Sequence, residues 1–166
     1  MLLALLSDTH DNAAATKAAV ALLALHKPAA YLHAGDLVDA AMLFHFAGIG
    51  PFHFVFGNNE YDQAAIRSQA RALDLFCHGH FADLTFAGKR VGLLHGHDSA
   101  LFHRLAVSDQ YDYLIHGHSH IRRDIRLPAP SRTRIINPGA LFRARTKSVA
   151  LLDVVADTLR FLELHV

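Results

Sequence analysis

The sequence has one cysteine, almost no net charge and no long apolar run. The single cysteine, Cys77, excludes an intramolecular disulfide framework and is typical of proteins from a reducing compartment. A net charge of +1 gives no general basis for binding nucleic acid or a membrane surface. No apolar stretch approaches the roughly 18 residues of a membrane span. The first apolar run, 2–6, is too short for a signal-peptide core and lacks a basic leader. We therefore expect a cytoplasmic protein with no membrane partner and no stable nucleic-acid complex.

The length and composition predict one globular domain over residues 1–166. Apolar residues make up 52% of the chain and charged residues 19%, and a chain of this size buries roughly 70% of its unfolded surface. The sequence contains no internal repeat, low-complexity tract or linker. It also lacks the Gly-x-Ser-x-Gly pattern of serine hydrolases, and Cys77 lies outside the main cluster of polar motifs, so serine or cysteine hydrolysis has no support.

Histidine is abundant, with 14 residues, and several of them follow short apolar runs. Five such runs end in residues that bind metals: 2–6 before Asp8 and His10, 29–34 before Asp36, 52–56 before Asn58, 91–94 before His95, and 111–115 before His118 and His120. Open α/β sheets build their sites at the carboxyl ends of neighbouring strands. We therefore expect these side chains to meet at one sheet edge.

The order of elements predicts an α/β fold with two sheets. In the first half, strands are expected over 2–6, 30–35 and 52–56, alternating with helical segments over 12–26, 39–46 and 61–75. In the second half we expect a hairpin over 82–94, a helix over 99–107, a strand over 111–115, and antiparallel strands over 121–127, 133–136, 149–155 and 159–164. The change from alternating strands and helices to mostly strands indicates two sheets packed face to face with helices outside.

The ligand types predict two metal ions. Histidine nitrogen, carboxylate oxygen and one amide oxygen form a set of seven, without thiolate, which is too large for one tetrahedral zinc site. Such a set suits two divalent transition-metal ions, Mn²⁺, Ni²⁺, Fe²⁺ or Zn²⁺, that share a bridging carboxylate. Two ions about 3.5–4 Å apart can hold a hydroxide for in-line attack on phosphorus.

These motifs resemble those of the calcineurin-like metallophosphoesterases, in particular the compact YfcE-like phosphodiesterases. The similarity covers residues 5 to about 140 and rests on Asp8-Thr9-His10, Gly35-Asp36-Leu37-Val38-Asp39, Gly57-Asn58-Asn59-Glu60, His95, Gly117-His118-Ser119-His120 and Asn137-Pro138-Gly139-Ala140. The resemblance implies a four-layer α/β/β/α sandwich of two packed mixed sheets flanked by helices.

The resemblance also implies roles for the seven ligands and their neighbours. One ion would be held by Asp8, His10 and His120, the other by Asn58, His95 and His118, with Asp36 bridging both. Mn²⁺ is the favoured metal. His97 would lie close enough to contact the substrate or to support the ligands. Asp39 and Glu60 would either orient neighbouring residues or cap the helices that follow them.

One position departs from the family pattern and bears on the substrate. The third motif usually has histidine where this chain has Asn59, which can donate a hydrogen bond to a phosphate oxygen but cannot deliver a proton. Asn59 and His97 are thus the candidate catalytic residues, and a phosphodiester with an acidic leaving group is favoured. A phosphomonoesterase and a non-catalytic interaction module on the same metal-binding fold remain the alternatives.

Eight of the 16 lysine and arginine residues fall between Arg122 and Lys147. They predict either an electropositive rim that attracts a phosphate-ester small molecule or nucleotide, or a solvated face of edge strands. Cys77 and the nearby His78 lack the partners of a structural zinc site, so we expect a strand or loop there. The apolar segment 42–56 could contribute to a homo-oligomer contact, although core packing is its ordinary use.

Overall fold

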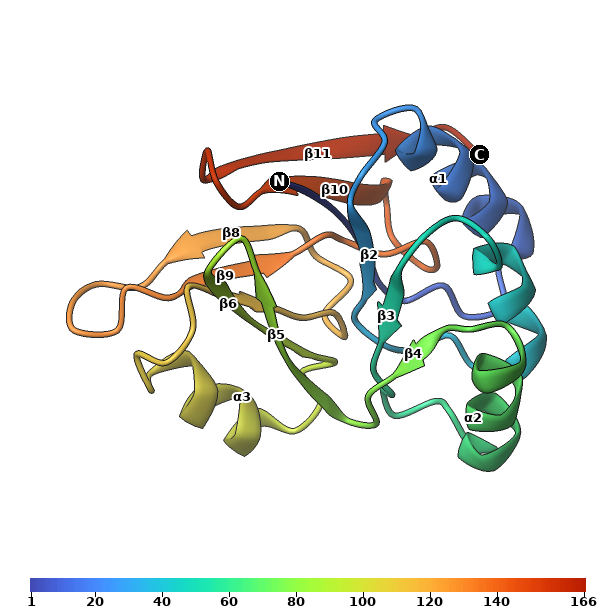
Figure 1. Cartoon of the computed structure of the whole chain (residues 1–166), viewed down its shortest axis with the longest axis horizontal. Coiled ribbons are helices and arrows are strands. Elements are labelled where there is room, and N and C mark those ends of the chain that lie inside the picture. Colours follow the sequence, from blue (N-terminus) through green and yellow to red (C-terminus); the bar gives the residue numbers. More distant parts are fainter.

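The computed structural model describes residues 1–166 and contains two mixed sheets (Figure 1). The first sheet has the strand order β11-β10-β1-β2-β3-β4. Its strands are β1 (Leu2–Leu6), β2 (Ala30–His33), β3 (Phe52–Phe54), β4 (Phe76–Cys77), β10 (Lys147–Asp153) and β11 (Thr158–Leu164). The second sheet has the order β5-β6-β7-β9-β8. Its strands are β5 (Phe81–Phe86), β6 (Lys89–Leu94), β7 (Tyr113–Ile115), β8 (Arg123–Arg126) and β9 (Arg134–Asn137).

Every helix begins after an Asn or Asp side chain that accepts a hydrogen bond from its first turn. The helices and their caps are α1 (Ala13–Ala24) after Asn12, η1 (Ala40–Phe46) after Asp39, α2 (Gln63–Ala72) after Asp62, and α3 (Ser99–Ala106) after Asp98. Such caps satisfy a backbone N–H that has no partner within the helix. Of the two roles expected for Asp39, the structure therefore shows capping. No helix combines the length and apolar character needed to cross a bilayer.

Three apolar clusters separate the layers. Between the first sheet and α1, η1 and α2 lie large aromatic residues, including Phe46 and Phe52, whose stacked rings are 4.2 Å apart. A second cluster, with Leu5 and Ile115, fills the space between the two sheets. A smaller cluster, which includes Leu114, lies between the second sheet and α3. Figure 1 shows α1 and α2 on one side of the molecule and α3 on the other. The predicted four-layer α/β/β/α arrangement is confirmed.

The later strands form parallel as well as antiparallel pairs and belong to both sheets, whereas the sequence predicted only antiparallel pairs among them. Strand β9 pairs antiparallel to β8, as expected, but also parallel to β7. The last hairpin belongs to the first sheet, because β10 pairs antiparallel to β1 with Leu3 opposite Leu152. Both residues are fully buried in the cluster between the sheets. The two halves of the chain therefore do not correspond to the two sheets.

Short backbone contacts join the loops at the carboxyl ends of the strands. The Asp8 N–H donates to Gly35 O at 3.0 Å, which links the loops after β1 and β2. The Gly117 N–H donates to His95 O at 2.9 Å, which links the loops after β6 and β7. Both sheets thus direct their polar loops toward the same edge, as predicted for a site at the ends of parallel strands.

Candidate metal centre

Five of the seven predicted ligands have left-handed backbone conformations. The φ angles are +54° at Asp8, +41° at His10, +60° at Asp36, +65° at His118 and +58° at His120. Residues other than glycine adopt this region rarely, and a strained position costs roughly 1–3 kcal/mol. Such strain gathers at functional sites, and here it lies in the segments that turn the candidate ligands toward one point.

Asp8, His10 and His120 form the first group of possible ligands. Asp8 Oδ1 lies 3.3 Å from His120 Nε2 and 3.9 Å from His10 Nε2. The carboxylate is fully buried, and its other oxygen accepts a hydrogen bond from the Ser7 hydroxyl. The His118 N–H also donates to Asp8 at 3.2 Å. Because these bonds fix the carboxylate, the three ligand atoms can share one ion.

Asp36 connects this group to His95. The Asp36 Oδ2 atom lies 3.3 Å from both His10 Nε2 and His95 Nε2. The other carboxylate oxygen accepts hydrogen bonds from the backbone N–H groups of Asn58 and Asn59, at 3.0 and 3.1 Å. Asp36 therefore lies between the His10 and His95 nitrogens, a position that suits the predicted bridging carboxylate.

Two buried imidazole nitrogens at this point have no hydrogen-bond partner. They are His10 Nε2 and His95 Nε2, although Asp36 Oδ2 is only 3.3 Å from each. Metal–nitrogen and metal–oxygen bonds are about 2.0–2.2 Å long, so two ligands of one tetrahedral ion lie roughly 3.4 Å apart. The spacing therefore fits ligands of a shared metal ion, and the unpartnered nitrogens supply the lone pairs.

The orientation of the His95 ring is fixed from its far side. His95 Nδ1 lies 2.8 Å from Ala34 O, and a carbonyl oxygen only accepts, so Nδ1 carries the proton. In the neutral ring Nε2 then carries the lone pair, and this nitrogen is directed at Asp36. Metal-binding histidines are commonly held by a hydrogen bond of this kind.

The remaining predicted ligands are more exposed. The His118 ring lies 5.1 Å from the His95 ring, and Asn58 follows the buried Gly57 at the end of the β3 loop. Among histidine and carboxylate ligands, two groups have their ligand atoms within 4.8 Å of one another: Asp8, His10 and His120, and Asp8, Asp36 and His95. His118 belongs to neither group, and the Asn58 side chain is exposed. The structure thus brings Asp8, His10, Asp36, His95 and His120 tightly together and places His118 and Asn58 at the margin.

Asn59 and Glu60 contact the centre in different ways. The Asn59 side-chain amide donates to Asp36 Oδ2 at 2.7 Å. The buried Glu60 carboxylate accepts from the Gly57 N–H at 2.7 Å and from the Leu37 N–H at 2.5 Å. Glu60 therefore ties the loop after β3 to the loop after β2. Of its two expected roles the structure shows this positioning one, because Asp62 caps α2.

The charges of the centre shift the pKa values of its members. Burial would raise the pKa of Asp36, but His10, His95 and the Asn59 amide together hold it well below its usual range. Burial lowers the pKa of His95, whereas the adjacent Asp36 carboxylate raises it more. The Asp8 carboxylate, which can accept a hydrogen bond from His120 Nε2, raises the pKa of that imidazole. The Asp36 carboxylate is therefore ionised and available as a ligand at neutral pH.

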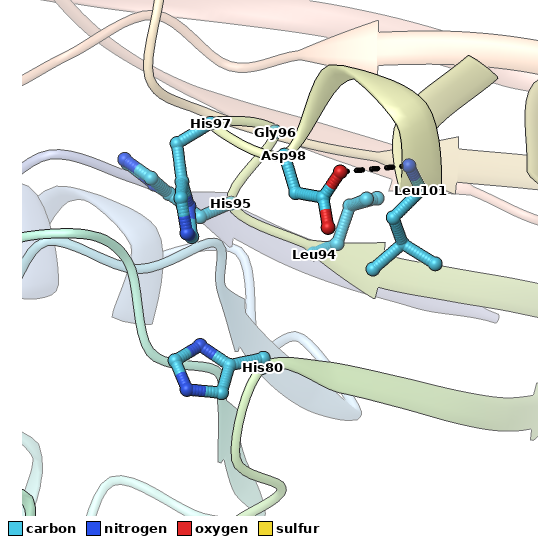
Figure 2. Close-up of a pocket in the computed structure, with 7 residues that line it drawn as sticks. All are labelled: His80, Leu94, His95, Gly96, His97, Asp98 and Leu101. Carbon is cyan, nitrogen blue, oxygen red and sulfur yellow. Dashed lines mark hydrogen bonds between the residues drawn. The ribbon is translucent and has the colours of Figure 1, made fainter.

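A cavity of about 340 Å³ opens beside His95, and its wall includes His97 and His80 (Figure 2). The rings of His80 and His97 lie 6.2 Å apart, and the His97 ring lies 5.5 Å from the His95 ring. Burial and the neighbouring histidines lower the pKa of His97. His80 was not among the site residues predicted from the sequence. In the sequence, His80 is distinguished only by its position after Gly79 and just before β5. Its place in the wall of this cavity follows from the fold.

Close packing of the loops requires glycine at two positions. A Cβ atom on Gly117 would lie 1.8 Å from Ser7 Oγ, and one on Gly57 would lie 2.1 Å from Asp36 Oδ1. Both distances are far below van der Waals contact. The glycines of the third and fifth motifs thus allow the backbone to approach the ligand carboxylates.

This arrangement places the protein among the metal-dependent phosphoesterases. The model of the calcineurin-like phosphoesterase superfamily domain matches residues 1–157, and the chain belongs to this superfamily. A phosphodiesterase of Methanocaldococcus jannaschii is 24% identical over 146 residues, which are 84% of this chain and 83% of the relative.

Solved structures confirm the fold. An archaeal phosphodiesterase superposes with a TM-score of 0.90 at 21% identity, over 99% of this chain and 100% of the other. The phosphoesterase YfcE from E. coli superposes with a TM-score of 0.69 at 17% identity, over 98% of both chains. At these identities the likeness defines the fold, and the particular substrate has to be argued from the site.

Proposed function

We propose that this protein is a phosphodiesterase that uses two divalent metal ions, with Mn²⁺ favoured and Ni²⁺, Fe²⁺ or Zn²⁺ possible. The main support for this proposal is the position of Asp36 Oδ2, 3.3 Å from two buried nitrogens, His10 Nε2 and His95 Nε2. Neither nitrogen has a hydrogen-bond partner. Unpaired buried polar atoms are rare because they are costly, so a ligand for them is expected. A metal ion is the ligand that suits this donor set.

The residues divide between two positions. Asp8, His10 and His120 would hold one ion, Asn58, His95 and His118 the other, and Asp36 would contact both. When bound, such ions lower the pKa of a water nucleophile and neutralise charge that develops on the phosphoryl oxygens. Asn58 and His118 are exposed, so a substrate could reach the second position from their side.

The chain's own groups bind and orient the substrate. The Asn59 amide, now bonded to Asp36 Oδ2, can instead donate to a phosphate oxygen. His97, at the wall of the adjoining cavity, can contact the leaving group. Because an amide cannot protonate a departing alkoxide at neutral pH, esters with acidic leaving groups should react best. This favours phosphodiesters, carried by a small molecule or a nucleotide, over monoesters.

The decisive experiment compares bis-p-nitrophenyl phosphate with p-nitrophenyl phosphate. Protein stripped with a chelator is refilled with Mn²⁺, Ni²⁺ or Zn²⁺, and release of p-nitrophenol is followed. We expect metal-dependent cleavage of the diester and little cleavage of the monoester. The His95→Ala variant should lose at least about 1,000-fold in kcat, because the loss of a ligand disables the metal chemistry. His103→Ala is the matched control, since His103 is exposed on α3.

Two other results would each replace the proposal with a different function. Faster cleavage of the monoester would identify a phosphomonoesterase in which another group supplies the proton. Protein that binds two ions, yet cleaves neither ester with any metal, would instead be a non-catalytic interaction module. Circular dichroism of each variant separates a lost function from a lost fold.

A further inference from the structure

A second cavity, of about 360 Å³, lies on the other flank of the centre. Three arginines from the basic segment, Arg122, Arg143 and Arg145, line it together with the hydroxyl-bearing residues Ser119 and Thr146. No acidic residue contributes to its wall. The cavity beside His95 differs sharply, because it has no lysine or arginine and includes Asp98 and two leucines. The two flanks of the centre therefore favour chemically different groups.

The basic cavity adjoins the metal centre through one shared residue, His120. His120 belongs to its wall, and the Nε2 atom of the same residue lies 3.3 Å from Asp8 Oδ1. Phe142 forms a further connection, since its ring lies 5.0 Å from the His10 ring. The guanidinium carbon of Arg143 lies over this ring, 5.0 Å from its centroid. A ligand in the cavity and a group bound at the ions would therefore both contact His120.

The arginines of the segment fall into two sets. Arg126 and Arg134 form ion pairs with Asp157 and Asp124, on the face away from the centre, and they fit the interpretation as a solvated face of edge strands. In the cavity, Arg122 is paired with Glu163 at 2.7 Å. Arg143 and Arg145 are exposed and form no ion pair in the structure.

Arg143 and Arg145 have no carboxylate partner in the cavity wall, so both are available to pair with an anionic ligand. Guanidinium groups bind phosphate with charge-assisted, often bidentate hydrogen bonds. Three of them around one cavity, with two hydroxyl groups, suit a doubly charged phosphate.

We propose that this cavity binds a second phosphate group of the substrate. The inference rests on the proposed phosphodiesterase function and names its substrate class: a phosphodiester in which one alcohol carries a further phosphate, as in a phosphorylated nucleoside. The second phosphate contacts Arg143 and Arg145 while the scissile phosphate lies at the ions. The uncharged leaving group then occupies the opposite cavity, which His80 and His97 line.

The test uses two chromogenic diesters that differ by one phosphate. These are thymidine 5′-(p-nitrophenyl phosphate) and the same compound with a 3′-phosphate. The wild-type protein should show a kcat/KM about 10- to 100-fold higher for the phosphorylated compound, as expected for one or two charge-assisted contacts. In the Arg143→Ala/Arg145→Ala variant this ratio should fall close to one. Equal ratios in the two proteins would overturn the inference.

A matched control removes the same charge elsewhere. Arg71 and Arg104 are exposed on α2 and α3 and line no part of the basic cavity. The Arg71→Ala/Arg104→Ala variant should keep the wild-type ratio. If it lost the preference to the same extent, general electrostatic attraction and not the cavity would be responsible.

A binding measurement separates failure of this inference from failure of the proposed function. Calorimetric titration of the metal-loaded protein compares thymidine 3′,5′-bisphosphate with thymidine 5′-phosphate, neither of which contains a diester. We expect tighter binding of the bisphosphate by about 10-fold or more, lost in Arg143→Ala/Arg145→Ala. Protein that hydrolyses no ester but retains this difference would refute the enzyme and keep the phosphate site. Active protein without the difference would refute the site alone.

Discussion

The Gly57→Ala substitution tests whether close approach of the backbone to Asp36 builds the centre. The added Cβ atom would lie 2.1 Å from Asp36 Oδ1 and 2.8 Å from His95 Cδ2. Ordinary van der Waals contact begins near 3.4 Å, so the carboxylate oxygen has to move by about 1.3 Å. Gly57 lacks a positive φ angle, so steric displacement, and not backbone strain, dominates the effect.

This displacement has consequences for both stability and function. Moving Asp36 lengthens the hydrogen bonds from the Asn58 and Asn59 N–H groups, now 3.0 and 3.1 Å long. Overpacking of this kind costs about 1–3 kcal/mol of unfolding free energy. A misplacement of about 1 Å in a reacting group can lower the rate roughly 100-fold. We therefore expect kcat/KM for bis-p-nitrophenyl phosphate to fall by about 100-fold.

Three measurements on one preparation check the prediction. Urea unfolding of metal-free protein gives the stability, calorimetric titration with Mn²⁺ gives the affinity and stoichiometry, and hydrolysis of the diester gives the rate. We expect the Mn²⁺ affinity to fall by about 10- to 100-fold, the range found when groups supporting a metal ligand are disturbed.

Gly48→Ala is the matched control for Gly57→Ala. Gly48 has a φ of +73° but open space around it, so alanine should cost about 1 kcal/mol through backbone strain alone. Metal affinity and rate should stay at wild-type values. The reasoning is refuted if folded Gly57→Ala protein binds Mn²⁺ and cleaves the diester as the wild type does.

Two further predictions concern Asn59 and His53. Asn59→His supplies a group that can donate a proton, so cleavage of phenyl phosphate, whose poor leaving group needs that proton, should rise by about 5-fold or more relative to p-nitrophenyl phosphate. An unchanged ratio of the two kcat/KM values would contradict this. The His53 ring lies 3.0 Å from His78 and is stacked on Phe76. Burial and the neighbouring His78 lower the pKa of His53 from 6.5 to about 4. The unfolded chain therefore binds more protons in this interval, and stability is present above pH 6.5 and lost as the pH falls toward 4. His53→Phe should flatten the dependence of the free energy of unfolding on pH between 6.5 and 4, by up to about 1.4 kcal/mol per pH unit. Urea unfolding at several pH values measures this slope, and identical slopes in the two proteins would count against the assignment.

Local patterns predicted the elements well because each has a local cause. The apolar runs predicted every helix and nearly every strand to within a few residues, for example α3 at Ser99–Ala106 against the expected 99–107. Strand directions were harder. That β10 pairs with β1 follows from which apolar faces meet across the sheets, and a hydrophobic pattern does not encode its partner.

The sequence by itself determined the chemistry of the site: the types of ligand, their order, and their position just after strands. Tertiary structure alone decided how closely they lie. It placed Asp36 between His10 and His95, left Asn58 and His118 at the margin, and divided the basic segment into paired and unpaired arginines. The physical reason is that a ligand's type is local covalent chemistry. Distances and ion pairs between residues far apart in the chain depend instead on how two sheets pack.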